Sequence, residues 1–509
     1  MDSTNQPMSS VPQVLVQNGA FDENQDTVLT SIRLEPNASS QIQSNFILPK
    51  NGSVLDSNSS LVWSVGWDGY DATNGKQQPA DQLVCLKQFS GGLNSIRRAR
   101  MYVGGRLLFT NPDVALSVHI HKLSTNPDHF CEVEDMKLGS AHGFNIADDG
   151  KVQTQPGVNN QLNSVSKMLT REVGSFSLVP ADNMSYECTL LLSDVFPALK
   201  HLQIPIKHLK DDMRIEIDWE TSFDETMLLA CDANNAITNF SVSINNPLLY
   251  LDYLTYNEEV EAGLAMASQQ GITIPYREIS LIQKQLSAIA NPASSQDILL
   301  GFQGKLLMKL YVSHKFANSI AGSSVRGAAY QRFNGRCRSD MGMNFKYNLI
   351  INDLHIHDSK VDTASQQYSF LSMTAENPIF AYPNSMDFNA RFNTAKQATD
   401  ITDATYRLAN AEVVSRGPAN QTLTDIEARD GIAGTQAFIG FDLSKYGTEG
   451  GLNPANAGYR VGSTPIILNI EQDGGATTTR QGAVKQVDVI CESIKILQIR
   501  NGMVDTTEA

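Results

Sequence analysis

The hydrophobic pattern changes its period twice between residues 240 and 276, near the middle of the chain. The run FSVSINN at the start of this stretch alternates apolar and polar residues, as in a strand with one covered face. Asn257 is a suitable helix cap, two glutamates follow it, and apolar residues recur at helical spacing until Gly271. Alternation then resumes. We therefore predict a short helix at 257–271 that connects two β domains.

The alternating segments before this connector recur after it, in the same order and at a nearly constant distance. MYVGGRLLF and NLIINDLHI both predict β-hairpins, with Gly104-Gly105 and Asn352-Asp353 at their turns. Four pairs of positions differ by 247 to 251 residues: Val103 and Ile351, Ser193 and Ser444, Ile215 and Ile466, and Val242 and Val489. Four ordered matches at one offset indicate an internal duplication.

Chain length and strand pattern together predict the architecture. A chain of 509 residues is too long for one hydrophobic core, and no βαβ rhythm is present. Eight strands in two facing sheets, a jelly roll, is the economical arrangement for each half. We predict an all-β fold of two tandem eight-stranded antiparallel jelly-roll barrels joined by a short helical linker, with long loop insertions at 125–186 and 374–436. The expected units are an N-terminal extended arm (1–37), a first jelly roll (38–256), the linker helix (257–271), a second jelly roll (272–500) and a C-terminal tail (501–509).

Several strands have a predicted inward face. Asn246-Pro247 separates the strand that begins at Phe240 from a second β-rich run at 249–253. The alternation predicts three inward-facing sets: Leu61, Trp63, Val65 and Trp67; Ile215, Ile217 and Trp219; and Leu306, Met308, Leu310 and Val312. We interpret the aromatic stripe of the first set as core rather than as a sugar-binding platform. Residues 1–37 are polar and without a period, so we expect the arm to be ordered only against another surface.

The charge balance argues against a phosphate-binding function. The chain has 39 basic and 54 acidic residues, a net charge of −15, whereas nucleic-acid-binding proteins are usually basic. The densest basic group surrounds the first hairpin: Arg97, Arg98, Arg100 and Arg106. We interpret it as a solvated or subunit-facing rim, and we expect no direct nucleic-acid partner. No apolar run approaches the ~20 residues that span a bilayer, and the N-terminus has no secretory pattern.

Candidate chemistry is sparse. The pairs His119/His121 and His355/His357 would each place two imidazoles on one strand face, a geometry that metal sites use, but neither pair has a third ligand at a motif distance. Surface or hydrogen-bonded core histidines are the alternative. The run GFQGK at 301–305 has the wrong spacing for a phosphate loop and leads into a strand.

The remaining polar and cysteine residues do not add a site. Asp211-Asp212 and Glu258-Glu259 are interpreted as loop and helix-start charges, and neither GxSxG nor HExxH occurs. The six cysteines, at positions 85, 131, 188, 231, 337 and 491, are scattered and are expected to be buried free thiols. We therefore predict no catalytic residue, no cofactor and no metal ligand.

Four stretches of the second half carry a resemblance to a known family: IPYR (274–277), DILLGFQGKLLMKLYV (297–312), YNLIINDLHIHD (347–358) and VDVICESIKILQIR (487–500). With the tandem barrels, the chain resembles double jelly-roll major capsid proteins of the adenovirus and tectivirus lineage, and most closely those of virophages and polinton-like viruses. The resemblance covers most of 40–500.

The resemblance implies a structural role. Three chains would form a homotrimeric, pseudohexagonal capsomer that tiles an icosahedral viral shell, with the long loops projecting outward. The implied partners are further copies of the chain, penton proteins and minor capsid proteins, and the implied location is the virion, assembled inside the host cell. An internal membrane is left open. Two alternatives also stay open: a tandem jelly-roll carbohydrate-binding protein and a bicupin-type metal enzyme.

Overall fold

The structure is a computed structural model, and it describes part of the chain. The described residues are 27–70, 83–86, 91–123, 135–138, 184–200, 202–222, 227–230, 238–286, 294–316, 345–351, 354–355, 439–444, 458–462, 465–472 and 485–508. Of the two predicted loop insertions, 374–436 lies wholly outside these residues and 125–186 lies mostly outside them. Their placement at one common end of the barrels therefore stays a prediction.

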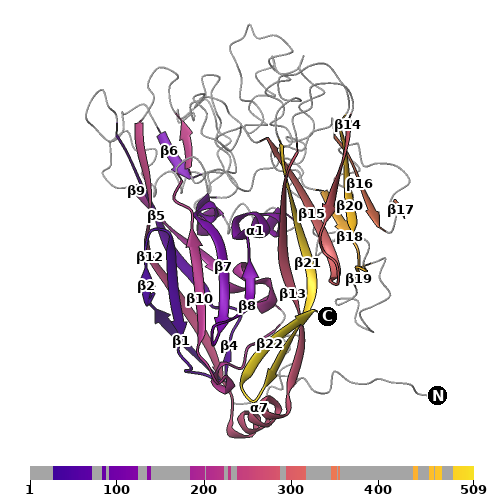
Figure 1. The fold of residues 1–509 in the computed structure, drawn as a ribbon. Helices are drawn as coiled ribbons and strands as arrows, with labels where there is room; N and C mark the ends of the chain where they lie inside the picture. The colour runs from indigo at the N-terminus through magenta and orange to yellow at the C-terminus, as the bar shows by residue number, and fades with distance from the viewer. Residues whose placement is uncertain are drawn as a thin grey trace, which may run out of the picture.

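The first half folds into two facing antiparallel sheets (Figure 1). One sheet has the order β1 (Val28–Leu34), β12 (Thr238–Thr255), β5 (Ser60–Tyr70) and β9 (Met184–Leu191), and β4 (Val54–Leu55) also pairs with β12. The other has the order β2 (Ala38–Ser39), β3 (Gln43–Leu48), β10 (Met213–Trp219), β7 (Ile96–Val103) and β8 (Arg106–Asn111). A separate pair joins β6 (Leu83–Leu86) and β11 (Met227–Ala230).

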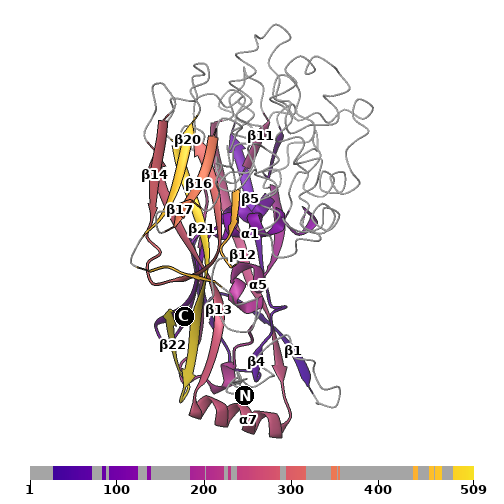
Figure 2. The same cartoon turned by 90° about the vertical axis from the view of Figure 1, so that its right-hand side faces the viewer.

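The second half also folds into two antiparallel sheets, which lie beside the first pair in both views (Figures 1 and 2). One has the order β13 (Ile272–Leu286), β21 (Lys485–Arg500), β15 (Leu306–Phe316) and β18 (Ile439–Asp442). Within it, β19 (Tyr459–Arg460) pairs with β15, and β22 (Met503–Glu508) pairs with β21. The other has the order β14 (Ser294–Leu300), β20 (Ile466–Gln472), β16 (Phe345–Ile351) and β17 (Leu354–His355).

The two halves have the same topology. Numbered in chain order, the eight core strands are β1, β3, β5, β7, β8, β9, β10 and β12 in the first half, and β13 to β18, β20 and β21 in the second. In both halves the sheets then have the orders 1-8-3-6 and 2-7-4-5. This identity confirms the predicted pair of eight-stranded jelly rolls and supports the duplication. Val103 and Ile351, for example, both end the fourth strand.

The predicted connector and hairpins are confirmed where they are described. Helix α7 (Glu258–Gln270) joins the halves; the Asn257 side chain accepts a hydrogen bond from the Val260 amide at 3.0 Å, and Gly271 ends the helix with φ 118°. Gly104 and Gly105 have φ 55° and 82°, as a two-residue hairpin requires. Strands β16 and β17 pair across the second turn, whose residues 352–353 lie outside the described part.

Asn246-Pro247 does not separate two strands, as the pattern suggested, but forms a bulge inside β12. Asn246 has φ 49°, and the pairing with β5 shifts register between Asn245 and Leu248. The extra residue changes which positions face inward, so that the even-numbered Ile244 and the odd-numbered Leu249 both reach the core. A bulge therefore extends one strand where a break was expected.

The predicted inward face of β15 is partly wrong for the same reason. Its pairing with β21 shifts register between Leu307 and Lys309. As a result Leu307, Leu310 and Val312 face the barrel core, whereas Leu306 and Met308 pack with Ile494 in a separate cluster. Simple alternation assigned Leu306 and Met308 to the core because a bulge leaves no mark in the hydrophobic pattern.

The aromatic stripe of the first barrel is core, as predicted. Trp63 and Trp219 are buried with ring centroids 6.0 Å apart. Each indole N–H donates to a serine hydroxyl at 2.8 Å, to Ser95 and Ser44 respectively. Leu61 and Val65 are likewise buried, while the Trp67 side chain lies outside the described part.

Both terminal segments differ from the expected boundaries. Residues 28–34, assigned to the arm, form β1 and pair with β12, because the edge of β12 at 249–255 needs a partner for its backbone groups. Residues 503–508, assigned to the tail, form β22, which turns back on β21 through Asn501-Gly502. Residues 1–26 lie outside the described part of the chain.

Candidate functional site

A buried junction joins the two barrels. Helix α1 (Val114–Leu123) of the first barrel packs its Leu116 and Ile120 against Ile279, Tyr311 and Ile490 of the second. All five side chains are at most 3% exposed. The outer face of the second barrel's β13-β21-β15 sheet is thus buried by the first barrel.

A second part of the junction lies near the linker, where the start of β13 and the end of β21 pack into the core of the first barrel. Buried side chains from the start of β13 and the end of β21 belong to the same core as the first barrel: Ile272, Ile274, Tyr276, Leu497 and Ile499. The Tyr276 hydroxyl donates to the Leu108 carbonyl at 3.3 Å, and its ring meets Phe109 edge-on at 4.9 Å. Because two strands of the second barrel contribute to the core of the first, we expect little freedom in the relative orientation of the barrels.

The C-terminal hairpin ties the barrels together. The Arg106 guanidinium, at the first hairpin, lies 3.5 Å from Asp505 and donates to the Val504 carbonyl at 3.3 Å. The Lys210 amide donates to the Gly502 carbonyl at 2.8 Å. Gly502 has φ 71°, and a Cβ there would lie 2.8 Å from the His208 carbonyl oxygen. Only glycine fits this close approach without strain.

The linker helix is held by ion pairs to the first barrel. The Glu261 carboxylate lies 3.1 Å from His208 Nε2 and 3.2 Å from Lys207 Nζ, and it accepts from the Ser53 hydroxyl. The pKa of the adjacent Tyr256 is raised to about 12, first by burial and then by the nearby carboxylates of Asp56 and Glu261. The linker is therefore a docked element of the junction.

The structure places the two candidate histidine pairs as follows. His119 and His121 lie on helix α1, so the strand assignment was wrong; two positions apart on a helix, they face different directions. His119 is fully buried, and His121 Nε2 lies 3.3 Å from Glu492 Oε1. His355 Nδ1 lies 3.0 Å from Asn348 Nδ2, while His357 is outside the described residues. Within the described ranges, no cluster of three histidine, cysteine or acidic residues has metal-binding geometry.

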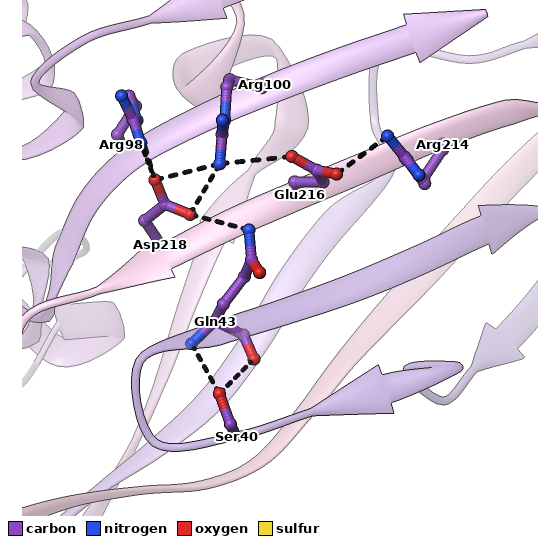
Figure 3. Close-up of polar contacts among 7 residues, drawn as sticks. All are labelled: Ser40, Gln43, Arg98, Arg100, Arg214, Glu216 and Asp218. Atoms are coloured by element: carbon purple, nitrogen blue, oxygen red, sulfur yellow. Dashed lines mark hydrogen bonds and ion pairs between the residues drawn. The ribbon is translucent and has the colours of Figure 1, made fainter. Parts of the chain in front are cut away.

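The arginine group of the first hairpin is paired with carboxylates (Figure 3). On the outer face of the first barrel, Arg98 lies 2.7 Å from Asp218, and Arg100 lies 3.0 Å from Asp218 and 3.2 Å from Glu216. Arg214 extends the network to Glu216 at 2.9 Å. These guanidinium groups are neutralised within the sheet. Arg98 is 47% exposed, in agreement with a solvated rim, whereas Arg100 is only 22% exposed. The subunit-facing alternative stays a prediction. The network also leaves the guanidinium groups poorly suited to phosphate binding.

The other candidates have structural roles. Gly304 forms a turn with φ 79°, and Lys305 donates to Ser280 at 2.7 Å and lies 3.4 Å from Glu278. Asp212 lies 3.4 Å from Lys50. Cys188 and Cys491 are buried free thiols, and burial raises the pKa of both. The other four cysteines lie outside the described side chains.

The junction residues were not identified from the sequence, although one signal was present. The run VICESIKILQI is apolar on both strand faces, which is typical of a strand buried on both sides. The contacts of Arg106 with the C-terminal hairpin have no comparable signal in the sequence. Its hydrogen-bond partner, the Val504 carbonyl, lies 398 positions away along the chain.

The fold defines a class, the tandem jelly roll, and known structures share it. A chain of the Sputnik virophage structure solved by cryo-EM at 3.5 Å has a TM-score of 0.54 at 11% identity, covering 94% of this chain and 88% of that one. The Faustovirus major capsid protein has a TM-score of 0.52 at 8% identity, covering 95% and 92%. The mavirus major capsid protein has a TM-score of 0.51 at 13% identity, covering 94% and 90%.

The chain thus has the double jelly-roll fold of viral major capsid proteins. No protein-family model matches the sequence, and no curated protein sequence is similar to it. Among the described segments, none of the helices has the length and apolar character to cross a lipid bilayer.

Proposed function

We propose that the chain is a major capsid protein that forms homotrimeric, pseudohexagonal capsomers of an icosahedral viral shell. One observation carries the proposal: two barrels of identical strand order are fixed side by side, because the ends of β13 and β21 pack into the core of the first barrel and α1 packs on the second. A chain with two similar lateral units gives a closed ring of three copies six similar sides. Such a unit fills the six-neighbour positions of a shell.

The fold likeness to capsid proteins supports this role at the level of architecture. The partners are other copies of the chain, and penton and minor capsid proteins complete the shell. The protein works in the virion and has no catalytic activity. The acidic net charge of −15 and the carboxylate-paired arginines support a shell protein that does not bind the genomic nucleic acid directly. We also propose that the N-terminal arm, whose residues 1–26 lie outside the described part of the chain, packs on a neighbouring chain.

The solution mass of the purified protein tests the trimer. Light scattering coupled to size exclusion should give about three times 55.7 kDa at micromolar concentration. Negative-stain images of the same fraction should show six-sided particles with a threefold axis. A stable monomer, or a stoichiometric bound metal with turnover, contradicts the capsid proposal and favours the carbohydrate-binding or bicupin alternative.

A further inference from the structure

In the second barrel, the outer face of the sheet that contains β21 is buried. In register, Tyr311 pairs with Ile490 and Lys309 pairs with Glu492. These four outward-facing side chains are 3%, 2%, 8% and 2% exposed, and Ile490 and Tyr311 pack directly against α1 of the first barrel. This face therefore receives the neighbouring barrel of the same chain.

The equivalent face of the first barrel is open to solvent in part. Val242 and Val489 occupy the same place in the eighth strand of each barrel, so the pair Ser243 and Gly66 corresponds to Ile490 and Tyr311. The next outward pair, Asn245 and Ser64, corresponds to Glu492 and Lys309.

Ser64, Ser243 and Asn245 are partly exposed. Beyond the bulge, Tyr250 continues this face of β12 and is 40% exposed. We name Ser64, Ser243, Asn245 and Tyr250 the Ser243 face.

We propose that the Ser243 face binds the second barrel of a neighbouring copy, in the way that the second barrel binds the first within one chain. The inference rests on the proposed homotrimer. A closed ring of six similar barrels has six contacts, three within chains and three between chains. The within-chain contact uses the outer face of the sheet that contains β21, so the between-chain contact uses the same face of the sheet that contains β12.

The composition of each face fits the stage at which that face becomes buried. The within-chain face is buried when the chain folds, so isoleucine and tyrosine are suitable there. A between-chain face is exposed to water until the copies meet, so an equally apolar face would favour aggregation. Serine, asparagine and glycine occupy the central positions instead, and Tyr250 offers the aromatic anchor that is frequent in protein interfaces.

The edge of β12 beside this face favours docking over strand addition. Gln41 caps both backbone groups of Ile244: its amide nitrogen donates to the Ile244 carbonyl at 3.2 Å, and its oxygen accepts from the Ile244 amide at 2.8 Å. In the second barrel, β13 pairs with the corresponding stretch of β21. Because Gln41 satisfies both edge groups of Ile244, we expect a partner to meet the face of the sheet here and not to extend it.

Charge insertion tests the assignment. Ser243→Arg in the full-length protein should lower the solution mass from about three times 55.7 kDa to one. Leu299→Arg is the matched control, because Leu299 is 58% exposed on the other sheet of the second barrel. This control should remain a trimer. If Ser243→Arg stays trimeric, or Leu299→Arg alone dissociates, the assigned face is wrong while the trimer stands. A monomeric wild-type protein contradicts the proposed function itself.

A measurement on the wild-type protein covers the case in which Ser243→Arg fails to fold. Hydroxyl-radical labelling of the trimer should leave Tyr250 at least five-fold less modified than expected from its 40% exposure in the single chain. Met266, 59% exposed on α7, provides the internal reference. Labelling of Tyr250 at the level of a free exposed tyrosine overturns the proposal.

Discussion

His121 on helix α1 of the first barrel lies 3.3 Å from Glu492 on β21 of the second barrel. The two side chains are 14% and 3% exposed, and Lys309 is opposite Glu492 in register. This pair places a carboxylate beside the apolar contact that Leu116 and Ile120 make with the second barrel. A buried carboxylate is costly unless it has partners, so the pair makes the fit between the barrels specific.

Replacement of Glu492 should destabilise the protein strongly. Glu492→Leu leaves His121 largely buried without its carboxylate, and we expect a loss of about 3–5 kcal/mol in the free energy of unfolding at pH 5.5. The double variant His121→Leu/Glu492→Leu should cost less than the sum of the two single variants. Urea unfolding of the four proteins gives the coupling free energy. Strict additivity would show that the two side chains do not interact.

The network around Asp218 should contribute more than an exposed ion pair. Asp218→Ala removes the partner of both Arg98 and Arg100, and Arg100 is only partly exposed. We expect a loss of about 1.5–3 kcal/mol, as for hydrogen bonds to charged groups. The control is Glu35→Ala. The Arg33 and Glu35 side chains are 59% and 75% exposed, so their ion pair should contribute less than about 0.5 kcal/mol to the free energy of unfolding. Equal losses in the two variants, measured by denaturant unfolding, would contradict the assigned role of the network.

Substitution of Gly502 should weaken the attachment of the C-terminal hairpin. Gly502→Ala forces a side chain into a left-handed conformation and against the His208 carbonyl, so we expect a loss of at least about 1–2 kcal/mol. Gly263→Ala is the matched control, because a Cβ there meets nothing within 4 Å inside α7. That change should stabilise the helix by about 0.5–1 kcal/mol. Thermal unfolding should therefore shift in opposite directions for the two variants.

Stability should decrease at alkaline pH because of buried tyrosines. A tyrosine in the unfolded chain ionises near pH 10, whereas burial raises the pKa of Tyr256 to about 12 and also raises those of Tyr253 and Tyr276. The folded state therefore keeps its protons while the unfolded state loses them. The contribution is intact below about pH 10 and is lost as pH rises from about 10 to 12.

The expected slope is about 1.4 kcal/mol per pH unit for each such tyrosine. For each protein, the free energy of unfolding is expressed relative to its value at pH 8. Between pH 10 and 11 this quantity should fall less steeply for Tyr256→Phe than for the wild-type protein. Urea unfolding at these pH values measures it. An unchanged slope would mean that Tyr256 ionises equally easily in both states.

The sequence by itself determined the modules and their repetition. A period of two residues predicted the strands, Asn257 and Gly271 predicted the ends of the linker helix, and Gly104-Gly105 predicted the hairpin. These features depend on local backbone preferences and on one-sided burial, which the order of residues records directly. The constant offset between halves then indicated two equal barrels, and the matching sheet orders support it.

Only the tertiary structure decided features that depend on contacts between distant segments. The alternation around His119 and His121 resembled a strand, yet this segment is helical: Asp113 accepts from the Leu116 amide at 3.0 Å, and the helix fills the space between the barrels. The carboxylates that neutralise Arg98 and Arg100 come from a strand more than a hundred positions away. A local pattern specifies which face of a segment is apolar, whereas burial, charge pairing and strand edges are set by the segments that fold against it.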